Sequence, residues 1–255
     1  MIITEKIIRD TLLLNEDDRD AYVLYGSYAR GDYESSSDVD ILRITTRRML
    51  APRLDGHVLL HIYDIRDLLE MAKQGSLFIL HLIREAKPIL DPNNYMREIN
   101  AAFDKPNSYS LVARKITKQA ITLLDVDESF FQTAPRQFTK VAVFICRTLV
   151  YAEHADLGSF SFSLRSLADG DKTASMLCVL KGRSSYSDFL RIRRAVHEKA
   201  RIPDARTVAC SLHELAQRSE ADPLAAGLLR RIVDGSGGDG YVFLPNVNES
   251  HRVVA

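Results

Sequence analysis

The chain has 255 residues, which is enough for one large domain or two of ordinary size. Hydrophobic residues make up 46% of it, the formal net charge at pH 7 is zero, and no apolar run approaches the roughly 20 residues of a membrane-spanning helix. This composition is typical of a soluble globular protein and speaks against a protein that spans a membrane.

Two features of the sequence predict a cytoplasmic protein. The first residues lack the basic segment, apolar core and small-residue cleavage site of a secretion signal. The cysteines are widely spaced, odd in number and surrounded by apolar residues, with no metal-binding spacing: Cys146, Cys178 and Cys210. We therefore expect them to be reduced core residues.

The first hundred residues show alternating strand and helix patterns. In chain order we expect a helix at residues 4–14, strands at 21–25, 38–45 and 57–63, and helices that start at Asp64 or Asp67 and at Ser76. Prolines and asparagines interrupt the pattern between residues 88 and 108, where we expect a helix only at 95–103. We place a domain boundary near residue 105.

Beyond this boundary the pattern becomes helical throughout, with helices expected at residues 108–125, 138–152, 186–200, 204–218 and 222–234. The segment 138–152 is apolar nearly all round and should form the buried central helix. Asp222 is a good N-cap, and Pro223 suits the first helical position. The sequence thus predicts an α+β protein: a small mixed sheet flanked by helices in residues 1–105, an α-helical bundle in 106–235, and a linker and tail in 236–255.

One stretch carries the residues that point to a function. Gly26 ends the first strand, and Ser27 can cap a short helix whose N–H groups favour phosphate. Ten residues separate Ser27 from Asp38, and Asp38 and Asp40 stand at i and i+2, so on a strand their carboxylates share one face. Two carboxylates on a strand, opposite a phosphate-binding turn, are what a site for Mg²⁺ and a nucleotide requires.

This spacing resembles the signature of the DNA polymerase β-like nucleotidyltransferase superfamily, which is Gly-Ser, about ten residues and then Asp-x-Asp. The likeness is closest to minimal nucleotidyltransferases and to antibiotic nucleotidyltransferases of the kanamycin type. It covers roughly the first ninety to one hundred residues. The matching positions are Gly26, Ser27, Arg30, Gly31, Asp38 and Asp40.

The resemblance implies an enzyme in which an acceptor hydroxyl attacks the α-phosphorus of a nucleoside triphosphate and expels pyrophosphate. The donor would be ATP or another NTP, AMP would be the transferred group, and Mg²⁺ would be the cofactor. Asp38 and Asp40 would be catalytic metal ligands. Gly26 and Ser27 would hold the β- and γ-phosphates, and Arg30 would either add a cation near the triphosphate or be a surface arginine.

The third carboxylate of the family has no clear equivalent in this sequence. The family places it on a later strand, here best matched by residues 57–63, which contain no acidic residue. Asp64 follows that strand and is a candidate catalytic residue, but it could equally be a helix N-cap. His61 is the alternative ligand. If neither serves, the site holds one metal tightly rather than two.

The acceptor is suggested only by charge. Residues 112–231 carry 19 Lys and Arg against 13 Asp and Glu, and the segment 186–200 is strongly basic, with Arg191, Arg193, Arg194 and Lys199. This pattern favours an acceptor that bears phosphate, such as RNA, over a cationic aminoglycoside, and a protein side chain is a further option. The rival hypotheses are an antibiotic adenylyltransferase and a non-catalytic nucleotide-binding or interaction module.

Overall fold

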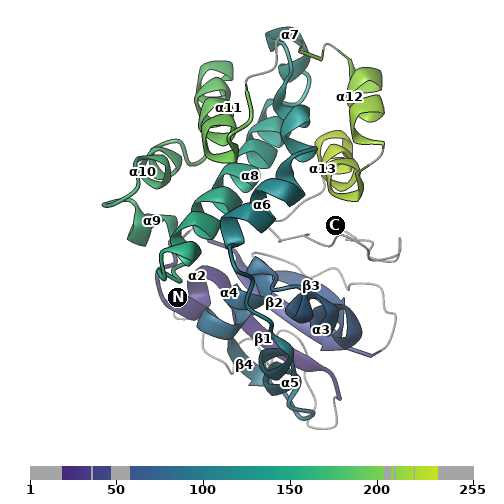
Figure 1. The fold of residues 1–255 in the computed structure, drawn as a ribbon, viewed down its shortest axis with the longest axis vertical. Coiled ribbons are helices and arrows are strands. Elements are labelled where there is room, and N and C mark those ends of the chain that lie inside the picture. The colour runs from purple at the N-terminus through teal and green to yellow at the C-terminus, as the bar shows by residue number, and fades with distance from the viewer. Residues whose placement is uncertain are drawn as a thin grey trace. The chain divides into compact units, whose positions relative to one another are not determined.

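The computed structural model describes residues 19–35, 37–46, 58–203, 208–209, 211–220 and 222–234. The chain forms two compact units that part between Lys105 and Pro106 (Figure 1). We call them the N-terminal unit and the helical unit. The helix expected at 4–14, the loop before the third strand, and the linker and tail expected at 236–255 lie outside the described residues.

The N-terminal unit contains a mixed sheet with the strand order β3-β2-β1-β4. Its strands are β1 (Ala21–Tyr25), β2 (Val39–Thr45), β3 (Val58–Asp64) and β4 (Lys87–Leu90). β1 pairs antiparallel with β2 and β4, and β2 pairs parallel with β3. The first three strands were predicted from their apolar runs. The fourth was missed because Pro88, which lacks an N–H donor, was read only as a break, yet an edge strand tolerates proline.

Four described helices accompany the sheet: α2 (Gly26–Arg30), α3 (Ile65–Lys73), α4 (Leu77–Glu85) and α5 (Tyr95–Ala102). The predicted cap of α4 is confirmed, because the Ser76 side chain accepts a hydrogen bond from the Phe78 N–H. The predicted cap of α2 is wrong. This helix begins one residue earlier, at Gly26, and Tyr25 precedes it without a side-chain cap hydrogen bond.

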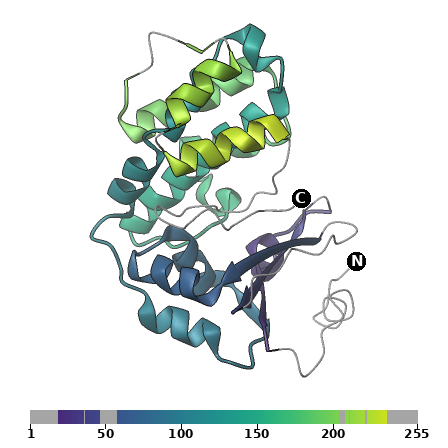
Figure 2. The same cartoon turned by 90° about the vertical axis from the view of Figure 1, so that its right-hand side faces the viewer.

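The two faces of the sheet have different neighbours. Because paired residues point to the same side of a sheet, Tyr25, Asp40 and Leu59 share one face. Helix α4 packs on this face, where the Phe78 ring lies 5.9 Å from the Tyr25 ring, and Figure 2 shows α3, α4 and α5 on one side of the sheet. On the opposite face Tyr22, Val39, Ile41 and Ile89 form a buried apolar cluster.

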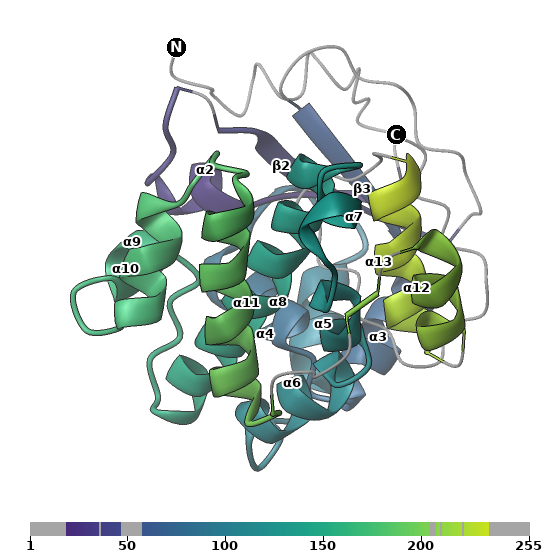
Figure 3. The same ribbon diagram turned by 90° about the horizontal axis from the view of Figure 1, so that it is seen from above.

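The helical unit is organised around α8 (Pro135–Asp156), a helix with thirteen buried residues. It packs against α6 (Tyr109–Thr117), α10 (Lys172–Val179), α11 (Tyr186–Ala200) and α13 (Pro223–Asp234), and it lies between α11 and α13 in Figure 3. The remaining elements are η1 (Ala120–Leu124), α7 (Glu128–Phe131), α9 (Leu164–Leu167) and α12 (Leu212–Ser219). The prediction of a buried central helix is confirmed, and the helix extends beyond it at both ends.

Several helix boundaries differ from the predictions. The helix expected at 108–125 ends at Thr117, and a 3₁₀ helix follows from Ala120. The helix expected from 204 begins at Leu212, where the Ser211 side chain caps it. The Asp222 cap is confirmed, because its carboxylate accepts from the Ala225 N–H at 2.8 Å. The α+β fold class is confirmed. Within the described ranges, no helix combines the length and apolar character needed to cross a membrane.

Candidate functional site

The turn between β1 and α2 brings bare backbone against a carboxylate. Tyr25, the last residue of β1, pairs with Asp40 of β2, and α2 begins at the next residue, Gly26. Gly26 has a left-handed φ of +72°, and a Cβ atom added there would lie 2.5 Å from Oδ2 of Asp40. Both the backbone conformation and the space therefore require glycine. This contact joins the two halves of the sequence motif.

The two motif aspartates lie at the start of β2. Asp40 is inside the strand and half-buried, whereas Asp38 is exposed and precedes the strand, which begins at Val39 rather than at residue 38 as predicted. Both carboxylates are at least partly exposed to solvent, and that of Asp40 lies beside the Gly26 turn. Hard cations such as Mg²⁺ prefer oxygen ligands of this kind.

Helix α2 is a single closed turn. Its end is marked by Gly31, whose φ is +85°. The N–H groups of Gly31 and Asp32 both donate to the Ser27 carbonyl oxygen, at 2.8 and 3.1 Å. The turn that contains Gly26 and Ser27 is thereby fixed by backbone hydrogen bonds.

Arg30 is held by two carboxylates. Its Nη1 donates to Oε2 of Glu85 at 2.9 Å, and its Nε donates to Oδ1 of Asp32 at 3.1 Å. Burial alone would lower the pKa of Arg30, but the hydrogen bonds to Glu85 and Asp32 outweigh it and raise that pKa above its ordinary value. Arg30 is therefore a charged, partly buried residue, neither a surface arginine nor a cation without a counter-charge.

Asp64 is not brought to the motif aspartates. It pairs with Thr45, five residues along β2 from Asp40, which corresponds to about 17 Å of strand and, because five is odd, to the opposite face. Its carboxylate accepts from the Arg66 N–H at 2.8 Å and caps α3. The sequence left open whether Asp64 is a catalytic residue or a helix N-cap, and in the structure it is an N-cap.

His61 lies closer to the motif. It pairs with Leu42, so it shares the face of Asp40 and lies one same-face step, about 7 Å, further along the sheet. Its ring meets the Tyr25 ring edge-on at 6.0 Å. Within the described ranges, no three His, Cys, Asp or Glu side chains are grouped to hold a metal ion.

The residues present fit a nucleotide-bound Mg²⁺. This ion is commonly held by only one or two protein carboxylates, with substrate phosphates and water as its other ligands. Asp38 and Asp40 supply such carboxylates, and Gly26, which is itself buried, has no side chain to separate its backbone from Asp40. A third protein carboxylate is therefore not a requirement for this site.

Two residues that were not predicted from the sequence, Glu85 and His81, lie behind the motif. Glu85 contacts both Arg30 and the Nε2 atom of His81, at 2.9 and 3.1 Å. The only signal in the sequence was the i, i+4 spacing of the two residues on one helix. That spacing gives no indication of a contact with Arg30.

Comparisons with known proteins place the motif in a family. The family model of the nucleotidyltransferase domain matches residues 5–72. Over 40 residues the chain is 45% identical to a putative protein adenylyltransferase of Methanocaldococcus jannaschii, a match that spans 16% of this chain and 40% of that protein. The chain thus covers less than half the length of this relative. Its N-terminal part contains a nucleotidyltransferase domain, consistent with the DNA polymerase β-like superfamily.

Proposed function

We propose that this protein transfers AMP from ATP to a hydroxyl group of a protein side chain. In this reaction a bond forms between the acceptor oxygen and the α-phosphorus, the bond from that phosphorus to the pyrophosphate breaks, and pyrophosphate and a proton are released. The observation that carries the proposal is the contact of Gly26 with the Asp40 carboxylate inside the nucleotidyltransferase domain.

Four residues have proposed roles in binding the donor. Asp38 and Asp40 would hold Mg²⁺, which when bound neutralises the phosphate charge and orients the leaving group. The backbone of Gly26 and Ser27 would hold the β- and γ-phosphates, because this turn lies directly beside the Asp40 carboxylate.

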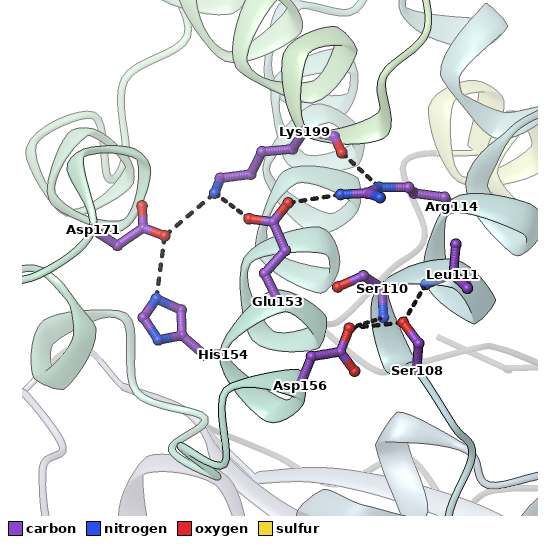
Figure 4. Close-up of polar contacts among 9 residues, drawn as sticks. All are labelled: Ser108, Ser110, Leu111, Arg114, Glu153, His154, Asp156, Asp171 and Lys199. Atoms are coloured by element: carbon purple, nitrogen blue, oxygen red, sulfur yellow. Dashed lines mark hydrogen bonds and ion pairs between the residues drawn. The ribbon is translucent and has the colours of Figure 1, made fainter.

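A protein acceptor is favoured by two observations. The archaeal relative is named as a protein adenylyltransferase, which supports both ATP as donor and protein as acceptor. The support for RNA is weaker than the sequence suggested, because three of the four Lys and Arg residues of α11 lie in ion pairs, two of them with other elements of the helical unit. Arg193 contacts Asp125 at 2.9 Å, and Lys199 contacts Glu153 at 2.7 Å, as Figure 4 shows for Lys199.

A non-catalytic module is the less favoured alternative. The argument for it was the missing third carboxylate, and Asp64 does cap a helix instead of joining the site. Two carboxylates nevertheless satisfy the usual protein contribution to a Mg²⁺–nucleotide complex. The proposed enzyme function therefore does not require a third carboxylate from the described residues.

The proposal is tested by asking which macromolecule becomes labelled. The full chain is incubated with Mg²⁺, a cell extract and each of the four NTPs labelled at the α-phosphate, and the protein, RNA and small-molecule fractions are then separated. We expect label from ATP in the protein fraction. Label in RNA or in an added aminoglycoside would replace the proposed acceptor, and no transfer from any NTP would overturn the proposed function.

A further inference from the structure

The geometry points to a positioning relay of Arg30, Glu85 and His81, which holds α2 in place so that Gly26 and Ser27 lie against the Asp40 carboxylate. The inference deepens the proposed function and rests on it for its activity measurement. It concerns how the phosphate-binding turn is held, and it assigns Arg30 to the support of that turn instead of to the triphosphate.

Helix α2 cannot move far without changing its contact with the Asp40 carboxylate. A Cβ atom at Gly26 would already lie 2.5 Å from Asp40 Oδ2, so helix and carboxylate are packed as closely as glycine permits. A movement of α2 toward β2 would displace the carboxylate, and a movement away would separate the turn from the metal ligands. Misplacement by about 1 Å can lower a reaction rate a hundredfold.

The helix does not fix its own position. It has five residues, far fewer than an isolated helix needs to be stable, and no side chain caps its first turn. Its apolar contacts come from the small methyl group of buried Ala29 and from the Tyr28 ring, which packs against the apolar cluster of the sheet. The partners of Arg30, the last residue of α2, add polar contacts at the other end of the helix.

Arg30 connects α2 to the packed helix α4. Its guanidinium donates to the last residue of α4, Glu85, at 2.9 Å, and this carboxylate also meets His81 Nε2 at 3.1 Å. The side chains are 19%, 11% and 4% exposed respectively, so the relay runs inward from the motif. The contact between Arg30 and Glu85 joins two charged groups that are well shielded from water, so it is stronger than a surface ion pair.

The relay reaches both ends of α2. The His81 ring meets the Tyr25 ring edge-on at 5.9 Å, and Tyr25 is the residue just before Gly26. Tyr25 is also the strand partner of Asp40. One helix, α4, thus contacts the residue before α2 through His81 and the last residue of α2 through Glu85.

The test compares Glu85→Ala with a control on a similar ion pair in the same unit. Asp20 accepts from Arg43 Nε at 2.8 Å, the two side chains are 8% and 14% exposed, and the pair lies at the other end of β1 and β2 from the motif. The Asp20→Ala variant therefore removes a comparable contact without touching α2. The Glu85→Gln variant keeps an acceptor oxygen for Arg30 and should rescue most of the loss.

The primary measurement is hydrogen exchange of the peptide spanning residues 27–32, with a peptide from α5 of the same unit as internal reference. We expect Glu85→Ala to accelerate exchange in α2 about tenfold or more relative to the reference, and Asp20→Ala to leave this ratio unchanged. Equal ratios in the two variants would overturn the relay, whether or not the protein transfers AMP.

The second measurement is the labelled transfer reaction. We expect kcat/KM to fall about a hundredfold in Glu85→Ala, much less in Asp20→Ala, and to recover in Glu85→Gln. Equal losses in the Glu85→Ala and Asp20→Ala variants would contradict the relay. A wild-type protein without activity would refute the proposed function, and the exchange measurement would still decide the relay.

Discussion

Gly26 and Gly31 lie at the two ends of α2 and both have a left-handed backbone, yet their surroundings differ. A Cβ atom at Gly26 would meet Asp40 Oδ2 at 2.5 Å, whereas at Gly31 no described atom lies within 4 Å of it. The same substitution at the two positions therefore separates the cost of the backbone conformation from the cost of displacing a site residue.

We predict that Gly26→Ala and Gly31→Ala each lower the free energy of unfolding by about 1–2 kcal/mol, because alanine is strained at a positive φ. Only Gly26→Ala should abolish AMP transfer, since only there does the new methyl group displace the Asp40 carboxylate. Urea unfolding and the labelled transfer reaction measure the two effects. Full activity of Gly26→Ala would show that the contact is not part of the site.

Asp64 offers a second prediction at a single residue. Because its carboxylate caps α3, Asp64→Ala should cost about 1 kcal/mol of stability and leave transfer activity intact. Ser76→Ala, which removes the cap of α4, is the control and should behave in the same way. If Asp64→Ala instead loses activity as completely as Asp40→Ala, then Asp64 reaches the reacting atoms and its assignment as a cap alone is wrong.

How far single residues could be predicted depended on how far apart in sequence their partners lie. Gly26 and Asp40 are joined by one short antiparallel connection, so the motif spacing was enough to predict that they face each other. Arg30 has a partner 55 residues away, and no local pattern indicates that contact. The prediction that Ser27 caps α2 was wrong because glycine can begin the helix directly at a positive φ.

At the level of helices and strands, strong periodicity was reliable and weak periodicity was not. β1 and α8 have apolar runs long enough to specify both their type and their burial. β4 has only four residues and contains Pro88, so its strand character depends on pairing with β1, which no local signal shows. The short helices α7 and α9 were also missed. Each has four residues, about one turn, which is too short to show a helical period.

One carboxylate, that of Asp171, links the start of helix α10 to side chains of α8 and α11. Its Oδ1 caps the helix by accepting from the Thr173 and Ala174 N–H groups, while its Oδ2 meets His154 Nε2 at 3.2 Å and Lys199 Nζ at 3.3 Å (Figure 4). Burial would raise the pKa of Asp171, but the backbone hydrogen bonds and Lys199 outweigh it, so the pKa lies below its ordinary value. The ionised form therefore stabilises the fold.

We predict that Asp171→Asn lowers the stability of the helical unit by about 1 kcal/mol at pH 7, because asparagine keeps the cap but loses the ion pair with Lys199. A lowered folded-state pKa means that this contribution is present above the ordinary Asp pKa of about 3.9 and is lost as the pH falls through the folded-state value. The free energies of unfolding of the wild type and of Asp171→Asn should therefore become equal at low pH.

Asp127→Asn is the control for this prediction. The Asp127 carboxylate also caps a helix, accepting from the Phe130 N–H at 2.7 Å. Among the described residues it does not join a lysine and a histidine as Asp171 does, so its substitution should change stability little at either pH. Urea unfolding followed by circular dichroism at pH 7 and pH 3 measures both variants. A difference for Asp171→Asn that persists unchanged at pH 3 would refute the role of the ion pairs.

For the whole molecule, the sequence motif and the basic segment that first suggested RNA belong to different units. The motif belongs to the N-terminal unit, and the basic segment belongs to α11 of the helical unit. Of the four cations on α11, Arg191 and Arg194 remain exposed. The count of charges in the sequence could not reveal that Arg193 and Lys199 are paired, because their partners lie on other elements.

The double variant Arg191→Glu, Arg194→Glu tests the acceptor at this scale. If the acceptor is a protein hydroxyl, as proposed, ATP binding should be unchanged and AMP transfer to protein should depend only weakly on salt. An RNA acceptor would give the opposite result, with transfer that falls steeply as salt rises and is further weakened in the double variant. That outcome would restore the acceptor predicted from the sequence.

The most direct test of the central claim, that the Gly26 turn and the two aspartates form a nucleotidyl transfer site, is transfer from α-labelled ATP by the wild type and by Asp40→Asn. We predict Mg²⁺-dependent labelling of protein by the wild type, and no labelling by Asp40→Asn at an unchanged circular dichroism spectrum. The added amide keeps the shape of the side chain but removes the charge that would hold the metal. Wild-type turnover in Asp40→Asn would contradict the account.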